Sequence, residues 1–177
     1  MFYKKDINGD TDSDYDFSLI DFTSIASKKV GLNSRISVGY LIRIRDDGEI
    51  NHRFIQQYAF TQKLNSFRLA HRFVSDQTTS KSEPIEFRLR YRIVAEIPLN
   101  GHSVDIKELY LKLGNEYLGS FQQENGANLE TRLLPFLGYV INDNHKFEIG
   151  LDYRIGSLLN QPTRHSYWMN INWFIEI

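Results

Sequence analysis

Residues 84–100 read PIEFRLRYRIVAEIPLN, and two kinds of side chain alternate along this stretch. The apolar set is Ile85, Phe87, Leu89, Tyr91, Ile93, Ala95 and Ile97. The other set is mostly charged: Glu86, Arg88, Arg90, Arg92, Val94 and Glu96. A period of two residues is typical of a β-strand that has one apolar and one polar face. The stretch therefore predicts a strand that separates two different environments.

The same alternation recurs along most of the chain. It is clear in residues 35–45, 67–74, 108–117, 146–155 and 167–176, and weaker in residues 17–28, 50–62 and 130–142. Helical periodicity is nearly absent. The sequence therefore predicts an all-β fold in which nine strands form a meander over residues 17–177 of a single domain, 1–177.

The connections between these segments alternate in length. Short ones are expected at residues 28–33, 61–66 and 141–146, and longer polar ones at 6–16, 75–84, 119–130 and 156–164. A long end and a short end are typical of an antiparallel up-and-down β-barrel. We therefore predict that the meander closes into a barrel.

Composition excludes several classes of protein. The chain has 177 residues, a formal net charge of −1 and no cysteine. No strong field attracts nucleic acid, and neither disulfides nor thiolate metal sites are available. The chain also lacks a run of about 18 apolar residues, which excludes a transmembrane helix. The first residues, MFYKKDINGD, contain no apolar segment of signal-peptide length.

Two architectures fit the alternation equally well. A soluble, lipocalin-like ligand-binding barrel would place the apolar set inside, whereas a membrane barrel places it against lipid and the charges in the lumen. Interior volume favours the membrane barrel, because a barrel of about eight strands has room only for its own side chains or one small ligand. The apolar set is too bulky for that space, whereas the charged set includes Gly39, Ala70 and Gly114.

The two sets of side chains then have defined environments. The predicted lipid-facing residues are Ile36, Val38, Tyr40, Ile42, Ile85, Phe87, Leu89, Tyr91, Ile93, Phe147, Ile149, Leu151, Tyr153, Tyr167, Met169, Ile171 and Trp173. The predicted charge network of the lumen is Arg43, Arg45, Arg68, Arg72, Glu86, Arg88, Arg90, Arg92, Glu96, Glu108, Lys112, Glu116, Arg132, Lys146, Glu148, Asp152 and Arg154. Because unpaired charges away from bulk water are costly, these residues should pair and plug the lumen. The excess of basic residues leaves a narrow anion channel as the alternative.

Several longer strings resemble a known family. They are GYLIRIRDDG and NHRF within residues 39–54, LNSFRLAHRFVSDQ at 64–77, PIEFRLRYRIVAEIPL at 84–99, YLKLGNEYL at 110–118 and TRLLPFLGYVINDNHKFEIGLDYR at 131–154. The chain resembles the domain of unknown function family 2490 from about residue 39 to 177. This resemblance implies an outer-membrane β-barrel, frequent in Gram-negative bacteria of the Bacteroidetes kind. It implies no catalytic residue, because the family defines none.

Family members usually begin with a signal peptide and an extra hairpin, which this sequence lacks. Bacterial single-chain barrels have an even number of strands with both ends on the periplasmic side. We therefore expect about ten strands, with residues 1–16 containing a strand remnant, MFYKK, and an acidic loop.

That loop is also a weak candidate for a Ca²⁺ site. Oxygen ligands recur at Asp6, Asn8, Asp10, Asp12 and Asp14, as a hard cation requires. However, the glycine and the bidentate glutamate of an EF-hand loop are missing, which favours a solvated loop. The five histidines, at 52, 71, 102, 145 and 165, lack metal spacing, so no cofactor is expected.

The sequence thus predicts a non-enzymatic protein of the bacterial outer membrane. A structural or accessory subunit of an outer-membrane assembly fits best, with the lipid bilayer and other outer-membrane proteins as partners and no role for nucleic acid. An anion channel and a soluble ligand-binding barrel are the alternatives. A lipid-modifying enzyme would require a Ser–His–carboxylate triad, which the spacing of these residues does not indicate.

Overall fold

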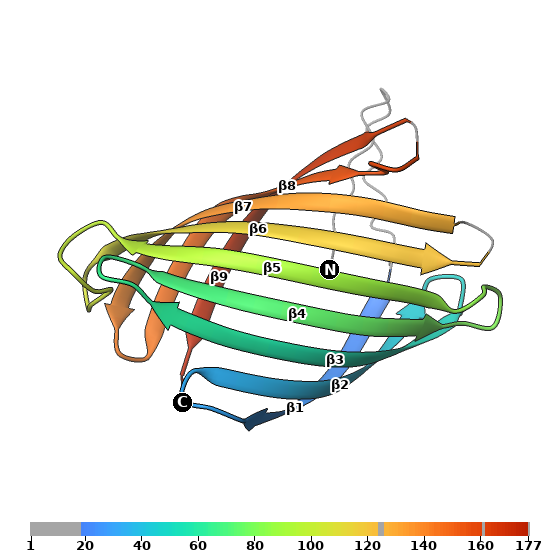
Figure 1. The fold of residues 1–177 in the computed structure, drawn as a ribbon, viewed down its shortest axis with the longest axis horizontal. Helices are drawn as coiled ribbons and strands as arrows, with labels where there is room; N and C mark the ends of the chain where they lie inside the picture. Colours follow the sequence, from blue (N-terminus) through green and yellow to red (C-terminus); the bar gives the residue numbers. More distant parts are fainter. Residues whose placement is uncertain (1–18, 124–125, 161, 177) are drawn as a thin grey trace.

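The computed structural model describes residues 19–123, 126–160 and 162–176, which form one β-sheet (Figure 1). Its nine strands are β1 (Leu19–Lys29), β2 (Ser34–Arg45), β3 (Ile50–Lys63), β4 (Arg68–Thr79), β5 (Glu86–Pro98), β6 (Leu109–Gln122), β7 (Gly126–Asn142), β8 (His145–Gly156) and β9 (Arg164–Ile175). Each strand pairs antiparallel with the next in chain order. The predicted all-β, antiparallel up-and-down fold is confirmed. The described ranges contain no helix that is long and apolar enough to cross a membrane.

The sheet curls into a half-barrel, and β9 passes behind the middle strands β4–β6 in the view of Figure 1. Within the described residues, β1 pairs only with β2, and β9 pairs only with β8. The two edge strands do not contact each other. The described strands therefore form an open sheet.

The predicted difference between a long-loop end and a short-loop end is wrong. β4, β6 and β7 continue into segments that were expected to be loops, so that residues 123–125 suffice to connect β6 to β7. The longest connection is residues 99–108, at the end that was expected to have short turns. Polar residues such as Gln77 and Thr78 stay in the strand because their backbones pair with β3 and β5. Side-chain polarity therefore did not mark the strand ends.

The two faces of the sheet differ sharply in exposure. Residues that pair directly across antiparallel strands share a face, which allows each side chain to be assigned from the register. All the buried residues among those described lie on the face of the charged set: Ser37, Leu41, Asn51, Val74, Asp76, Tyr110, Gly114, Glu116, Leu134, Gly138, Val140, Glu148 and Asp152. We call this the inner face. The opposite, outer face carries exposed apolar side chains, including Val38 at 63%, Leu89 at 68% and Met169 at 74%.

Small residues on the inner face leave room for large neighbours. The Tyr110 ring of β6 lies directly over Gly138 of β7, so that a Cβ at position 138 would overlap the ring. The Tyr110 hydroxyl donates a hydrogen bond of 2.8 Å to Glu148 Oε1 on β8. This contact fixes the spacing of three adjacent strands and buries the tyrosine almost completely.

This packing predicts the effect of adding one methyl group. Gly138→Ala should lower the free energy of unfolding by about 1–3 kcal/mol, as expected for overpacking. Gly119→Ala is the matched control, because the nearest atom to its new Cβ, Leu89 O, would be 4.0 Å away. Chemical unfolding of the refolded protein measures both changes. Equal stability of the two variants would contradict the packing described for Tyr110.

Candidate functional site

Two fully buried carboxylates organise the inner face. Asp76 on β4 and Glu116 on β6 both have side chains with 0% exposure. Each lies among arginines that neighbouring strands supply. Because a buried carboxylate without partners is very costly, these arginines determine whether the strands can assemble in this register.

Asp76 is held by arginines of β3 and β5. Arg88 on β5 is the direct cross-strand neighbour of Asp76, and its Nε donates a hydrogen bond of 2.7 Å to Asp76 Oδ1. Arg90 donates from Nη2 to Oδ2 at 2.5 Å. On the other side, the Arg53 Nε of β3 is 3.7 Å from Oδ1. One carboxylate therefore ties β3, β4 and β5 together.

Glu116 has a similar arrangement of three arginines. Arg92 donates from Nε to Oε2 at 2.6 Å, and Arg72 donates from Nη2 to the same oxygen at 3.0 Å. Arg132 Nη1 lies 3.4 Å from Oε1. Arg92 and Arg132 are the direct cross-strand neighbours of Glu116, whereas Arg72 reaches it from β4. This cluster ties β4, β5, β6 and β7 together.

Further ion pairs extend the network to both sides. Arg43 binds Asp21 through two hydrogen bonds, of 2.8 and 2.7 Å. The others are Arg68–Glu96, Arg88–Glu86, Arg132–Glu130, Arg154–Asp152 and Lys112–Glu148. Such pairing offsets the cost of removing the charges from water. The inner face therefore carries two clusters, around Asp76 and Glu116, and four separate ion pairs among the described residues.

The structure places the predicted charged residues unevenly in this network. All of them except three form an ion pair with a described residue. Arg45 and Lys146 have no ion pair among the described residues. Glu108 precedes β6, and its carboxylate accepts a hydrogen bond from the Asp105 backbone N–H.

The sequence reasoning missed four members of the network, namely Asp21, Arg53, Asp76 and Glu130. For Asp76 a signal was available. It continues the alternation of Arg72 and Val74 on the same face, although the strand was expected to end at Val74. Extending the period of two residues through the polar segment would have identified it.

The residues expected to face lipid all lie on the outer face, or just before β5 in the case of Ile85. Five are half-buried, namely Tyr40, Ile42, Tyr91, Ile93 and Tyr153, and the rest are exposed. The three tyrosines are half-buried because each packs against a neighbouring ring. Their partners in the closest ring pairs are Phe54, Phe73 and Tyr167, at centroid separations of 5.0, 4.6 and 4.7 Å.

Polar atoms on the outer face bind one another. The hydroxyls of Tyr40, Tyr91 and Tyr153 lie 2.6, 2.9 and 2.9 Å from the Nδ1 atoms of His52, His71 and His165. Gln56 and Gln77 form two reciprocal amide hydrogen bonds, of 3.3 and 3.2 Å. These tyrosine, histidine and glutamine atoms are thus bonded within the protein, whereas the buried His71 Nε2 has no hydrogen-bond partner among the described residues.

The histidines form no recognisable catalytic or metal site. His165 bonds a tyrosine hydroxyl, and in the part of the chain that the structure describes no group of three His, Asp, Glu or Cys side chains is arranged to hold a metal ion. The candidate Ca²⁺ ligands Asp6, Asn8, Asp10, Asp12 and Asp14, and the expected strand remnant, lie outside the described residues.

Residues 13–165 match a family described as "Protein of unknown function (DUF2490)". This match confirms the family resemblance that the sequence strings indicate. No curated protein and no solved structure matches the chain.

The Glu116 cluster predicts a large loss of stability when its charge is removed. Glu116→Gln would leave Arg72, Arg92 and Arg132 close together without their common counter-ion. We expect the free energy of unfolding to fall by about 3–5 kcal/mol. Chemical unfolding, followed by tryptophan fluorescence, measures this change.

Glu96→Gln is the control for this experiment. Its partner Arg68 has a side chain that is 55% exposed, and water can replace the lost carboxylate. We expect a loss of at most about 1 kcal/mol. Similar losses in the two variants would show that the buried cluster is no more important than a surface pair.

Proposed function

The chain belongs to the DUF2490 family, and from this premise we propose that it is an integral β-barrel protein of a bacterial outer membrane. Its role in this proposal is structural or accessory rather than enzymatic, with the bilayer and other outer-membrane proteins as its partners. The inner ion pairs form a plug, and the outer face contacts lipid.

The distribution of charge between the two faces carries the proposal. The outer face of the nine described strands carries a single charged side chain, Lys28, and all other Asp, Glu, Lys and Arg residues of these strands lie on the inner face. Lys28 is the residue before the last of β1. Contact with lipid explains why charged residues are nearly absent from this face, because an arginine or lysine at the bilayer midplane costs about 2–4 kcal/mol. Contact with water would not disfavour charged residues. Soluble monomers rarely expose apolar patches above a few hundred Å².

Two further features of the sheet support a lipid environment. The strands have between 11 and 17 residues, whereas about 9–11 residues suffice to cross a bilayer when tilted. The hydrogen-bonded His–Tyr and Gln–Gln pairs of the outer face satisfy polar atoms where no water is available. In hydrocarbon an unsatisfied polar group costs several kcal/mol.

The same argument leads us to propose closure of the sheet. An open strand edge is not tolerated in hydrocarbon, because its N–H and C=O groups would have no partners. β1 and β9 run in the same direction, since the strands between them alternate. One further strand, antiparallel to both, would satisfy both edges and give an even total of about ten.

The inner face supports a plug more than an open pore. Asp76 and Glu116 each hold three arginines across adjacent strands. Side chains fixed in this way have no freedom to exchange partners with a passing ion. A structural role in the membrane therefore fits this geometry best.

One pair of substitutions on β9 tests the lipid environment. Met169 lies near the middle of β9 on the outer face and is 74% exposed, and Asn170 points to the inner face. In lipid vesicles, Met169→Arg should lower the free energy of unfolding by about 2–4 kcal/mol. Asn170→Arg should have a smaller effect. Equilibrium urea unfolding from phosphatidylcholine vesicles measures both.

A protein whose outer face contacts water would behave differently. An exposed methionine can then be replaced by arginine within about 0.5 kcal/mol, and the wild-type protein would remain soluble after removal of detergent. Either result would overturn the proposal.

A further inference from the structure

One cross-strand row on the inner face has an unusual excess of positive charge. Successive direct pairs across the strands run in the order Lys29, Arg35, Ala59, Arg72, Arg92, Glu116, Arg132 and Arg154. The row contains six cations and a single carboxylate. Like charges that lie directly opposite each other destabilise a sheet, and this row contains three such pairs of neighbours: Lys29–Arg35, Arg72–Arg92 and Arg132–Arg154.

Among the described residues, only the cations of this row on β4, β5, β7 and β8 form ion pairs with a carboxylate. Glu116 lies among Arg72, Arg92 and Arg132, and Asp152 binds Arg154. Lys29 and Arg35, at the β1–β2 side, take part in none of the ion pairs formed by the described residues. Among the described residues, these two adjacent positive charges therefore have no counter-ion.

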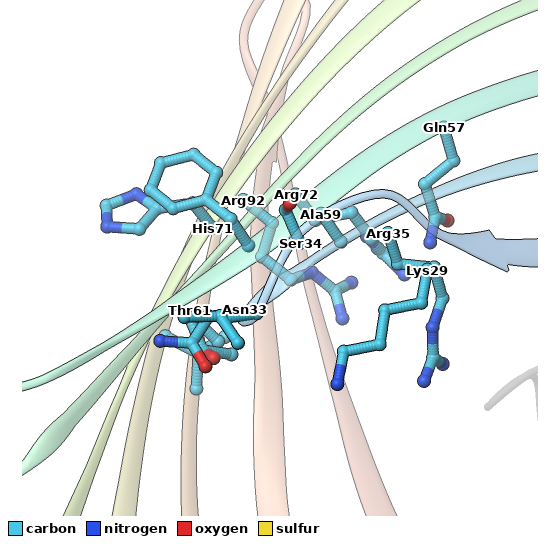
Figure 2. A pocket seen from close by; sticks show the side chains of 14 residues that line it. Lys29, Asn33, Ser34, Arg35, Gln57, Ala59, Thr61, His71, Arg72 and Arg92 are labelled. Carbon is cyan, nitrogen blue, oxygen red and sulfur yellow. The ribbon is translucent and has the colours of Figure 1, made fainter.

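A cavity of about 530 Å³ lies over this part of the row (Figure 2). Among the described residues, four cations line it, Lys29, Arg35, Arg72 and Arg92, and no carboxylate does. Ala59 and Ala70 contribute small side chains to its lining, which leaves the space open. In Figure 2 the Lys29 and Arg35 side chains extend next to each other on one side of the sheet, and the His71 ring lies apart from them.

We propose that this cavity binds the phosphate group of an organic phosphate monoester. Such a group carries about 1.5–2 negative charges near neutral pH, which matches the two uncompensated charges of Lys29 and Arg35. Guanidinium groups bind phosphate oxygens through two parallel hydrogen bonds. Carboxylate ligands carry one charge per group and would neutralise only half of the excess.

The cavity is also large enough for more than the phosphate. Its volume lies within the range of about 300–1,000 Å³ that is typical of small-molecule sites. Asn33, Ser34, Gln57 and Thr61 line it as well and supply amide and hydroxyl groups. These groups suit a polar body, such as a sugar or glycerol unit, attached to the phosphate. All four cations of the lining lie on the inner face, whereas Ser34, Phe60 and His71 of the lining belong to the outer face of β2, β3 and β4.

Calorimetric titration of the purified full chain in neutral detergent tests the site. Glucose 6-phosphate is the probe, and glucose is the matched probe without the phosphate. We expect saturable binding of glucose 6-phosphate and no heat from glucose. Absence of glucose 6-phosphate binding, or equal binding of both probes, would overturn the proposal.

Two arginines of the same strand provide matched variants. Arg35 lines the cavity, whereas Arg45 lies on the same face at the other end of β2. The separation of ten residues along the strand corresponds to about 33 Å, because a strand rises by about 3.3 Å per residue. Neither forms an ion pair with a described residue. Arg35→Gln should weaken glucose 6-phosphate binding by about tenfold or more, as expected for the loss of a charge-assisted hydrogen bond. Arg45→Gln should leave the affinity within about twofold, since only long-range attraction changes.

Stability without ligand separates a binding defect from a folding defect. Arg35→Gln removes the repulsion with Lys29, so its unliganded midpoint of thermal unfolding should equal or exceed that of the wild type. If Arg45→Gln weakens binding as much as Arg35→Gln, the attraction is not local, and the assigned site is wrong.

Lipid nanodiscs identify the source of the phosphate. Phosphatidic acid presents the same monoester on a lipid, whereas phosphatidylcholine does not. If phosphatidic acid nanodiscs compete with glucose 6-phosphate and phosphatidylcholine nanodiscs do not, the site takes a lipid headgroup. If neither lipid competes, while Arg35→Gln still weakens glucose 6-phosphate binding, the site takes a soluble phosphate ester.

Discussion

Asp76 and Glu116 hold together the middle of the sheet, because each buried carboxylate is shared by arginines from neighbouring strands. The shared carboxylates make the register of β3–β7 highly specific. A slip by one residue would turn every charged side chain to the opposite face. It would also separate each carboxylate from its arginines. The sheet therefore depends on charges that can be accommodated on one face only.

This segregation of charge gives the two faces different physical roles. The inner face is compact around its ion pairs, and the Tyr110 hydroxyl and Lys112 both reach Glu148 there. The outer face is apolar, and three His–Tyr pairs and one Gln–Gln pair form hydrogen bonds on it. The inner network is not balanced everywhere, since Lys29 and Arg35 have no carboxylate partner among the described residues. The inner face can thus contain a site for an anion near one edge of the described sheet.

The sequence was sufficient to predict the strands and their faces, because a period of two residues directly reports a strand between two environments. Residues 84–98 illustrate this, since β5 begins and ends within this stretch with the expected alternation. The ends of β4, β6 and β7 were not predictable from polarity, because they depend on backbone pairing with neighbouring strands. The Asp76 cluster, the contact between Tyr110 and Gly138 and the basic cavity depend on register between strands, which no local pattern contains.

The two tryptophans of β9 allow the most direct measurement of the central claim, that the outer face contacts lipid. Trp173 lies on the outer face and is 64% exposed, whereas Trp168 lies on the inner face with the Arg154 guanidinium 5.6 Å from its ring. Trp168→Phe and Trp173→Phe leave one tryptophan each, and both variants are reconstituted in bilayers with and without acyl-chain bromine. We predict strong bromine quenching of Trp173 and weak quenching of Trp168. Equal quenching of both, or stronger quenching of Trp168, would contradict the assignment of the outer face to lipid.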